Sequence, residues 1–77
     1  MIRKVEIYSK NNCAYCDMAM KFFDSKKIPY QVYKADNAIV FNEMLERNPN
    51  ARTVPQIFID DELIGGYTDL VEYFSKQ

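Results

Sequence analysis

The sequence contains no histidine, and this absence removes several kinds of chemistry at once. Without an imidazole there is no histidine general base, no Ser-His or Cys-His catalytic pair, and no imidazole ligand for a metal. Long apolar runs are also missing, because the longest, such as residues 38–41, fall far below the roughly 18 residues that span a bilayer. We therefore expect no transmembrane helix, and any catalysis must come from cysteine or carboxylate side chains.

The chain has no excess of one charge and no stretch that resembles a signal peptide. Ten Lys and Arg against eleven Asp and Glu give a formal net charge of -1, which argues against a strongly basic nucleic-acid module. Residues 1–10 alternate charged and apolar side chains where a secretory signal carries an unbroken apolar region. We expect a cytoplasmic protein with neither nucleic acid nor membrane as its partner.

The length of 77 residues predicts a single domain over residues 1–77, with one small core. The hydrophobic content of 48% has to be used almost completely, because so short a chain buries only roughly 60% of its unfolded surface. With 27% charged and 14% aromatic residues the composition is that of a globular domain. We expect it to fold alone and to work as a monomer.

The hydrophobic pattern predicts four strands and three helices in the order β-α-β-α-β-β-α. Strands are indicated by alternation or by short apolar runs, helices by apolar residues three to four apart. The predicted strands are residues 4–8, 30–33, 56–59 and 63–64; the helices run from Cys13 to about Lys27, from the cap at Asp36-Asn37 to Asn48-Pro49, and onward from a cap at Thr68. A strand-helix-strand start demands a parallel pair and a terminal hairpin an antiparallel one, so we expect an α/β fold with a four-stranded mixed sheet flanked by helices.

The two cysteines, Cys13 and Cys16, lie at the predicted start of the first helix, just after the loop that follows the first strand. At a helix N-terminus the free N–H groups and the helix dipole stabilise a thiolate, so we expect a lowered pKa at Cys13, with Lys10 adding a positive charge nearby. Cys16 lies one turn deeper on the same face and is close enough to form a disulfide. This placement favours a nucleophilic and a resolving cysteine.

Other uses of the pair fit the sequence less well. A zinc site needs four ligands, and without histidine or a third cysteine the rest must be carboxylates or come from a second chain. A structural disulfide across so short a loop stabilises little and is reduced in a cytosol. Two inert buried cysteines remain an alternative, but that interpretation does not explain their position at a helix start. We expect redox chemistry and no metal.

The segment Thr53-Val54-Pro55 precedes the third predicted strand. An X-Pro bond here marks a change of chain direction, and only about 5 to 6% of such bonds are cis. If this one is cis, Val54 presents free N–H and C=O groups beside the thiol, as an edge for an extended peptide. The residues alone leave the isomer open.

Three motifs together resemble those of the dithiol glutaredoxins over nearly the whole chain. They are residues 8–16, which end in the C-A-Y-C motif, residues 53–59, which begin T-V-P, and residues 65–70, which begin G-G-Y-T-D. Each motif alone is weak, but their combination at these distances is specific. The chain departs from the family at Ala14, where the family has proline, and at Tyr67-Thr68, where it has a small or acidic pair.

The resemblance implies a thioredoxin-like fold, a cis Pro55 and disulfide exchange at Cys13. It also implies a glutathione site formed by Lys10, Tyr15, Thr53, Val54, Pro55, Gly66, Thr68 and Asp69. The glycyl carboxylate of glutathione needs a cation such as Lys10, and the γ-glutamyl carboxylate fits the N–H groups that begin the last helix. Arg47 and Arg52 are either second cations or ordinary surface charges.

The function that we expect is a glutathione-dependent thiol-disulfide oxidoreductase with Cys13 as nucleophile and Cys16 as resolving cysteine. Its substrates would be protein disulfides and glutathione mixed disulfides, and ribonucleotide reductase is the protein partner that the resemblance implies. The alternatives are a redoxin recharged by thioredoxin reductase, a dimer that carries an iron-sulfur cluster with two glutathiones, and a redox-silent binding module.

Overall fold

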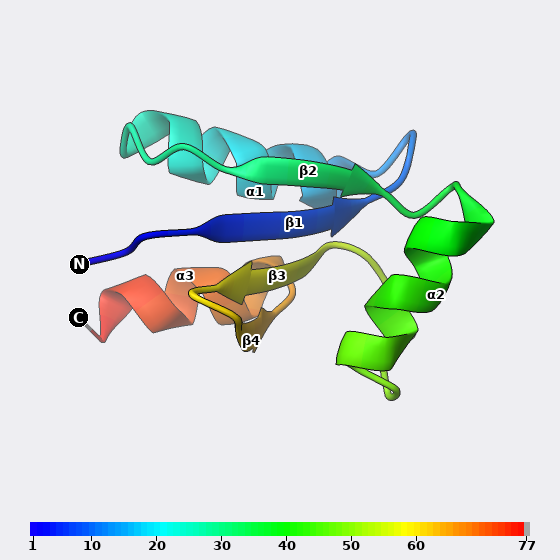
Figure 1. The fold of residues 1–77 in the computed structure, drawn as a ribbon. Coiled ribbons are helices and arrows are strands. Elements are labelled where there is room, and N and C mark those ends of the chain that lie inside the picture. Colours follow the sequence, from blue (N-terminus) through cyan, green and yellow to red (C-terminus); the bar gives the residue numbers. More distant parts are fainter. Residues whose placement is uncertain (77) are drawn as a thin grey trace.

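The computed structural model describes residues 1–76 and confirms the predicted order of elements (Figure 1). The elements are β1 (Val5–Ser9), α1 (Ala14–Ser25), β2 (Gln31–Lys34), α2 (Ala38–Arg47), β3 (Gln56–Ile59), β4 (Glu62–Gly65) and α3 (Tyr67–Ser75). Within residues 1–76, no helix is long and apolar enough to cross a bilayer.

The strands form one mixed sheet in the order β2-β1-β3-β4. Strands β1 and β2 are parallel, and the β1/β3 and β3/β4 pairs are antiparallel, as the sequence predicts. Helices α1 and α3 begin at the same end of the molecule, where β1 ends and the segment after α2 enters β3 (Figure 1). The thioredoxin-like fold thus gathers two helix N-termini and two connecting segments at one edge of the sheet.

Alternation along the central strands divides the core between the two faces of the sheet. On one face Val5 and Ile7 of β1 pack with Phe23 of α1 and Leu70 of α3, and all four are at most 2% exposed. Side chains of β1 and β3 that point to the other face pack with Met44 of α2 in a second cluster. Successive side chains of a strand point to opposite faces of the sheet. Because helices pack on both faces, both sets of side chains are buried.

Helix α2 begins at the cap that the sequence predicts, whereas α3 does not. The Asn37 side-chain oxygen accepts hydrogen bonds from the N–H groups of Ile39 and Val40, at 2.8 and 3.3 Å. The predicted cap of α3 at Thr68 is wrong, because the helix starts at Tyr67.

The start of α3 is set by a glycine turn and one carboxylate. Gly66 is the N-cap, and its N–H donates to the Asp69 carboxylate at 3.0 Å. Gly65 has φ of +122°, and a Cβ at this position would collide with the Asp69 carboxylate. The chain therefore turns out of β4 through a glycine and enters the helix one residue before Thr68.

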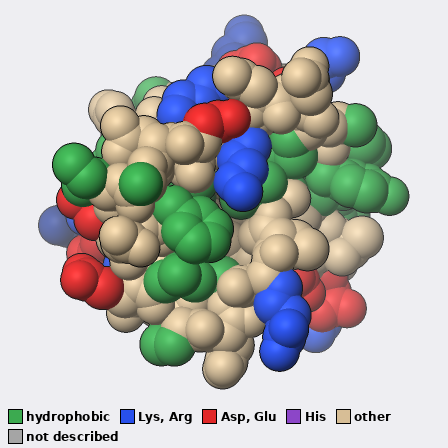
Figure 2. Space-filling model, turned by 90° about the vertical axis from the view of Figure 1, so that its right-hand side faces the viewer, with side chains coloured by type: hydrophobic (Ala, Val, Ile, Leu, Met, Phe, Trp, Pro, Cys, Tyr) green, Lys and Arg blue, Asp and Glu red, His purple; other side chains and the backbone are tan. Residues whose placement is uncertain are grey.

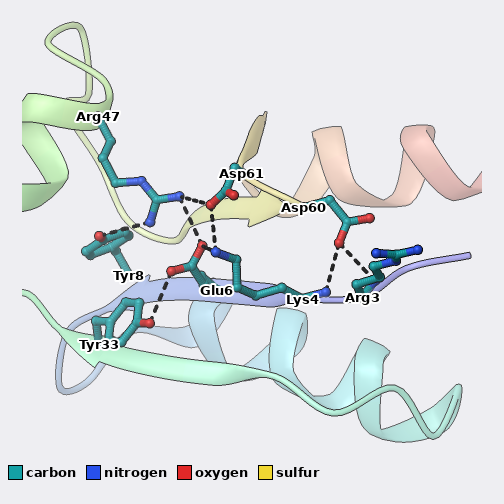
Figure 3. A network of polar contacts seen from close by, with 8 residues as sticks. All are labelled: Arg3, Lys4, Glu6, Tyr8, Tyr33, Arg47, Asp60 and Asp61. Carbon is teal, nitrogen blue, oxygen red and sulfur yellow. Dashed lines mark hydrogen bonds and ion pairs between the residues drawn. The ribbon is translucent and has the colours of Figure 1, made fainter.

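A polar network joins the end of α2 to β1, β2 and the β3–β4 turn (Figure 3). The Arg47 guanidinium at the end of α2 lies 3.0 Å from the Glu6 carboxylate and donates to the Tyr8 hydroxyl at 3.2 Å. Its carbon lies 3.9 Å from the centroid of the Phe58 ring. Lys4 pairs with Asp61 at 2.8 Å, which ties the β3–β4 turn to the same network.

The network keeps Glu6 ionised although the residue is only 7% exposed. Burial by itself raises the pKa of this carboxyl, but hydrogen bonds from Arg47 and Tyr33 and the charges of Arg47 and Lys4 outweigh it and hold the pKa below its usual value. Burial by itself lowers the pKa of Arg47, but its hydrogen bonds to Glu6 and Tyr8 and the charge of Glu6 outweigh this and raise the pKa above its usual value. Glu6 and Arg47 thus form a charged pair that joins α2 to the sheet.

Candidate redox site

Cys13 and Cys16 form a disulfide at the N-terminus of α1, with their Cα atoms 5.2 Å apart. Cys13 is the N-cap of the helix, and the Cys16 N–H donates to the Cys13 sulfur at 3.2 Å. Cys16 is fully buried, whereas Cys13 is partly exposed. An incoming disulfide can therefore reach Cys13, whose sulfur lies at the positive end of the α1 dipole and accepts one N–H of the first turn.

The segment before β3 lies against this sulfur. The Val54–Pro55 peptide bond is cis, which confirms what the resemblance implies. The Cys13 sulfur lies 3.6 Å from the Val54 carbonyl oxygen. A reacting disulfide at Cys13 would thus be flanked by the backbone of an extended segment.

The loop that carries Cys13 is held to the β2–α2 connection. The Asn11 N–H donates to both carboxylate oxygens of Asp36, at 3.2 and 3.3 Å, and Lys34 donates to the Asn11 side chain at 3.1 Å. The Ala35 N–H donates to the Ser9 carbonyl at 2.7 Å. These contacts fix the approach of β1 to α1 and hence the position of the nucleophile.

A cavity of about 680 Å³ lies beside the disulfide and collects most of the predicted glutathione residues. Of the predicted set it is lined by Tyr15, Thr53, Val54, Pro55, Gly66, Thr68 and Asp69. The first backbone hydrogen bond of α3 runs from the Leu70 N–H to the Gly66 carbonyl. The N–H groups of the residues before Leu70 in the first turn are therefore not used by bonds within the helix. The cavity therefore joins an extended backbone edge to a helix N-terminus suited to a carboxylate.

The structure assigns different surroundings to the three candidate cations. Lys10 is exposed, outside the cavity lining, and its ammonium nitrogen lies 5.1 Å from the centroid of the Phe41 ring. Arg52 lines the cavity, and Arg47 is engaged in the network with Glu6. Figure 2 views the end of the molecule near the active-site loop and α2, where Lys and Arg side chains stand around a group of hydrophobic ones.

Two further residues of the cavity, Gln56 and Asn48, were not predicted from the sequence. The Gln56 side chain donates to the Thr53 carbonyl at 2.7 Å and accepts from the Asn48 amide at 3.1 Å. Gln56 is only 6% exposed. The sequence does contain a hint, because Gln56 is a polar residue at the start of an otherwise apolar strand. A polar side chain that is buried in a native core needs a hydrogen-bond partner.

Replacing Gln56 with methionine should destabilise the protein by about 1–3 kcal/mol, because the Thr53 carbonyl and the Asn48 amide lose their partner. We expect a lower urea midpoint with an unchanged slope. Gln31→Met is the matched control, since Gln31 is an exposed glutamine of β2. Equal urea midpoints for the two variants would show that Gln56 does not hold the segment.

The surroundings of the disulfide favour sulfur exchange. Among residues 1–76, no three His, Cys, Asp or Glu side chains are grouped closely enough to hold a metal ion. A redox-capable cysteine pair at a helix start, beside the segment that leads into β3 of a mixed sheet, defines a thiol-disulfide oxidoreductase of the thioredoxin-like class.

Comparison with known proteins identifies the family within this class. The glutaredoxin family model matches residues 5–64, and the chain belongs to the glutaredoxin family. Glutaredoxin 3 of Escherichia coli K12 is 46% identical over 67 residues, which are 86% of this chain and 80% of that protein.

Two solved structures show how closely the fold is shared. Glutaredoxin 1 from Francisella tularensis, crystallised with cacodylate, has a TM-score of 0.80 at 35% identity and covers 95% of this chain and 93% of its own. A buckwheat glutaredoxin–glutathione complex has a TM-score of 0.81 at 29% identity over 94% of this chain and 68% of its own. The predicted family and fold class are confirmed, and the roles of single site residues stay predictions.

Proposed function

We propose that this protein reduces protein disulfides and glutathione mixed disulfides with glutathione as its reductant. The observation that carries the proposal is the difference between the cysteines: Cys16 is fully buried, whereas Cys13 is partly exposed and its sulfur lies 3.6 Å from the carbonyl oxygen of Val54, which lines the cavity. In addition, a similar structure is that of a glutaredoxin–glutathione complex.

The reaction begins with the Cys13 thiolate. It attacks one sulfur of the substrate disulfide, forms a mixed disulfide and releases the other sulfur as a thiolate that takes up a proton. The Cys16 thiolate then attacks the Cys13 sulfur, which forms the internal disulfide and releases the second substrate thiol. The substrate gains two electrons and two protons, and the dithiol loses them.

Glutathione restores the dithiol in two further exchanges. A first glutathione thiolate attacks the Cys13 sulfur, which frees Cys16 and leaves a glutathionyl group on Cys13. A second glutathione attacks that group and leaves as glutathione disulfide. When the substrate is itself a glutathione mixed disulfide, Cys13 alone can complete the cycle.

The cavity offers complementary groups to both ends of the tripeptide. We assign the γ-glutamyl carboxylate to the N–H groups of the first turn of α3 at Thr68 and Asp69, and the backbone of the cysteinyl residue to Val54. Arg52 lines the cavity and can pair with the glycyl carboxylate. Lys10, on the loop before Cys13, adds positive charge at the end of the molecule where α1 begins.

The physiological setting follows from this chemistry. Dithiol exchange driven by glutathione needs a reducing compartment, so we propose that the protein is cytoplasmic. We also propose that it acts as a monomer. Disulfide-bearing enzymes, among them ribonucleotide reductase, are the proposed electron acceptors.

Two reducing systems separate this function from that of a redoxin recharged by thioredoxin reductase. The oxidised protein is incubated with NADPH, glutathione and glutathione reductase, or with NADPH and thioredoxin reductase alone, and free thiols are counted by alkylation and mass spectrometry. We expect rapid reduction of the Cys13–Cys16 disulfide in the first mixture and little in the second. The reverse result would assign the protein to the thioredoxin reductase pathway.

A further inference from the structure

Two tyrosines stack at the rim of the cavity, one from each helix that begins there. The ring centroids of Tyr15 and Tyr67 lie 6.1 Å apart, with 29° between the ring planes. Tyr15 stands between the two cysteines and is 59% exposed. Both residues line the cavity. The stack therefore links the active-site turn of α1 to the first turn of α3.

The two rings differ in how firmly they are held. Tyr67 is only partly exposed and packs against the core cluster that includes Leu70 of its own helix. Tyr15, by contrast, projects from the first turn of α1, where Ala14 stands in the place of the family's proline. A ring anchored on the core thus supports a ring that stands largely in solvent. Stacked aromatic pairs are attractive beyond the area that they bury.

We propose that Tyr67 is a positioning residue that holds the Tyr15 ring against the cavity, so that the two rings form an aromatic wall selective for glutathionyl groups. This inference rests on the glutathione-dependent function proposed above. The wall offers a flat apolar surface to the methylene groups and amide planes of a bound tripeptide, beside the polar groups of Val54 and of the α3 N-terminus. A small disulfide without the tripeptide leaves most of this surface uncovered.

The physical basis is preorganisation. If the Tyr15 ring is ordered before the substrate arrives, its rotamer freedom is not lost on binding. The chemical step takes place at the sulfurs of Cys13 and of the substrate, and the stack supplies none of the reacting atoms. Loss of the stack should therefore raise KM for a glutathione mixed disulfide and leave kcat nearly unchanged.

A double-mutant cycle on Tyr15 and Tyr67 tests this assignment with a glutathionylated peptide as substrate. Tyr67→Ala is expected to raise KM about 2- to 10-fold, as the loss of an aromatic pair implies, and Tyr67→Phe to restore the wild-type KM because it keeps the stack. In the Tyr15→Ala background, Tyr67→Ala should raise KM by a clearly smaller factor, because only the direct contact of the Tyr67 ring with the substrate is then lost. Val71→Ala, an exposed apolar truncation on the same helix, is the matched control and should leave KM unchanged.

Two kinetic results would overturn the inference. Equal increases in KM for Tyr67→Ala with and without the Tyr15 ring would show that Tyr67 does not act through Tyr15. An equal increase for a small alkyl disulfide would show that the wall does not select the tripeptide. Thermal unfolding of each variant, followed in parallel, ensures that the assays compare folded proteins.

A spectroscopic measurement separates this inference from the proposed function. The ring-proton resonances of Tyr15 are followed by NMR in the oxidised protein without any substrate. We expect them to shift in Tyr67→Ala and to stay near their wild-type positions in Tyr67→Phe. If the wild-type protein fails to turn over glutathione, the proposed function fails; if Tyr15 resonances are unchanged in Tyr67→Ala, the positioning role fails whatever the activity.

Discussion

Cys13→Ser is expected to reduce disulfide exchange to the uncatalysed rate, whereas Cys16→Ser should still release glutathione from mixed disulfides. Cys13 is the partly exposed sulfur at the N-terminus of α1, and the Cys16 N–H donates to it. A serine hydroxyl at this position cannot form the mixed disulfide through which exchange proceeds. Removal of the glutathionyl group needs only the nucleophile and a second glutathione.

The measurement compares two substrates for each variant. A glutathionylated peptide reports the step that uses Cys13 alone, and a protein disulfide reports the step that also needs Cys16. We expect Cys13→Ser to be inactive on both and Cys16→Ser to be inactive on the protein disulfide only. Equal loss of both activities in the two variants would contradict the assignment of nucleophile and resolving cysteine.

Arg47→Met is expected to lower the free energy of unfolding by about 3 kcal/mol at neutral pH. Glu6, whose side chain is 9% exposed, then keeps its charge without the guanidinium 3.0 Å away, and breaking a buried pair has a cost of this order. We take the lower end of the range because the Arg47 side chain is itself 26% exposed. Methionine keeps an apolar contact with the Phe58 ring, so the loss reports mainly the charge.

Glu6→Gln combined with Arg47→Met should recover much of this stability, because it removes a buried carboxylate that keeps only Lys4 and Tyr33 as partners. Lys76→Met is the control, since Lys76 pairs with Glu72 on the exposed surface of α3 and its loss should change stability little. Chemical denaturation of the four proteins gives the comparison. A double variant as unstable as Arg47→Met would show that the loss came from packing.

The Glu6 pair also makes stability depend on pH in a defined direction. Because folding lowers the pKa of Glu6, its contribution is complete above the unfolded value of 4.5 and declines as the pH falls through the lower folded value. Wild-type stability should therefore fall in acid below about pH 4.5, and Glu6→Gln should remove part of that slope. Parallel curves for both proteins would exclude this role of Glu6.

Several features of the site were predictable because each rests on a local pattern. The alternation of apolar and polar residues predicts β1, and a short apolar run predicts β3. The cap at Asn37 is predicted because an amide side chain stands just before an amphipathic segment. The position of Cys13 at a helix start follows from the change of hydrophobic period at that residue. The position of Val54 beside the thiol was expected only if the Val54–Pro55 bond is cis, and the residues alone left that isomer open; the structure shows the cis bond and the 3.6 Å contact.

The contacts of polar side chains could not be predicted in the same way. Lys10 was assigned to the thiol and the ligand, yet its ammonium lies over Phe41, which is 31 residues away in the numbering. Arg47 was a candidate second cation for glutathione and instead pairs with Glu6 of β1. Gln56 was part of a strand pattern, and its role in holding Thr53 depends on how the chain enters β3.

The sequence by itself determined the order of the elements, the pair of cysteines at the start of a helix and, through the combined motifs, the glutaredoxin family. The elements and the cysteine pair depend on the spacing of residues a few positions apart, and the family on the combination of three such local motifs. Only the tertiary structure decided that α3 begins at Tyr67, that the Tyr67 ring stacks on the Tyr15 ring, and that Arg52 lines the cavity. Long polar and aromatic side chains have many local rotamers, and the neighbour that selects one comes from a distant segment.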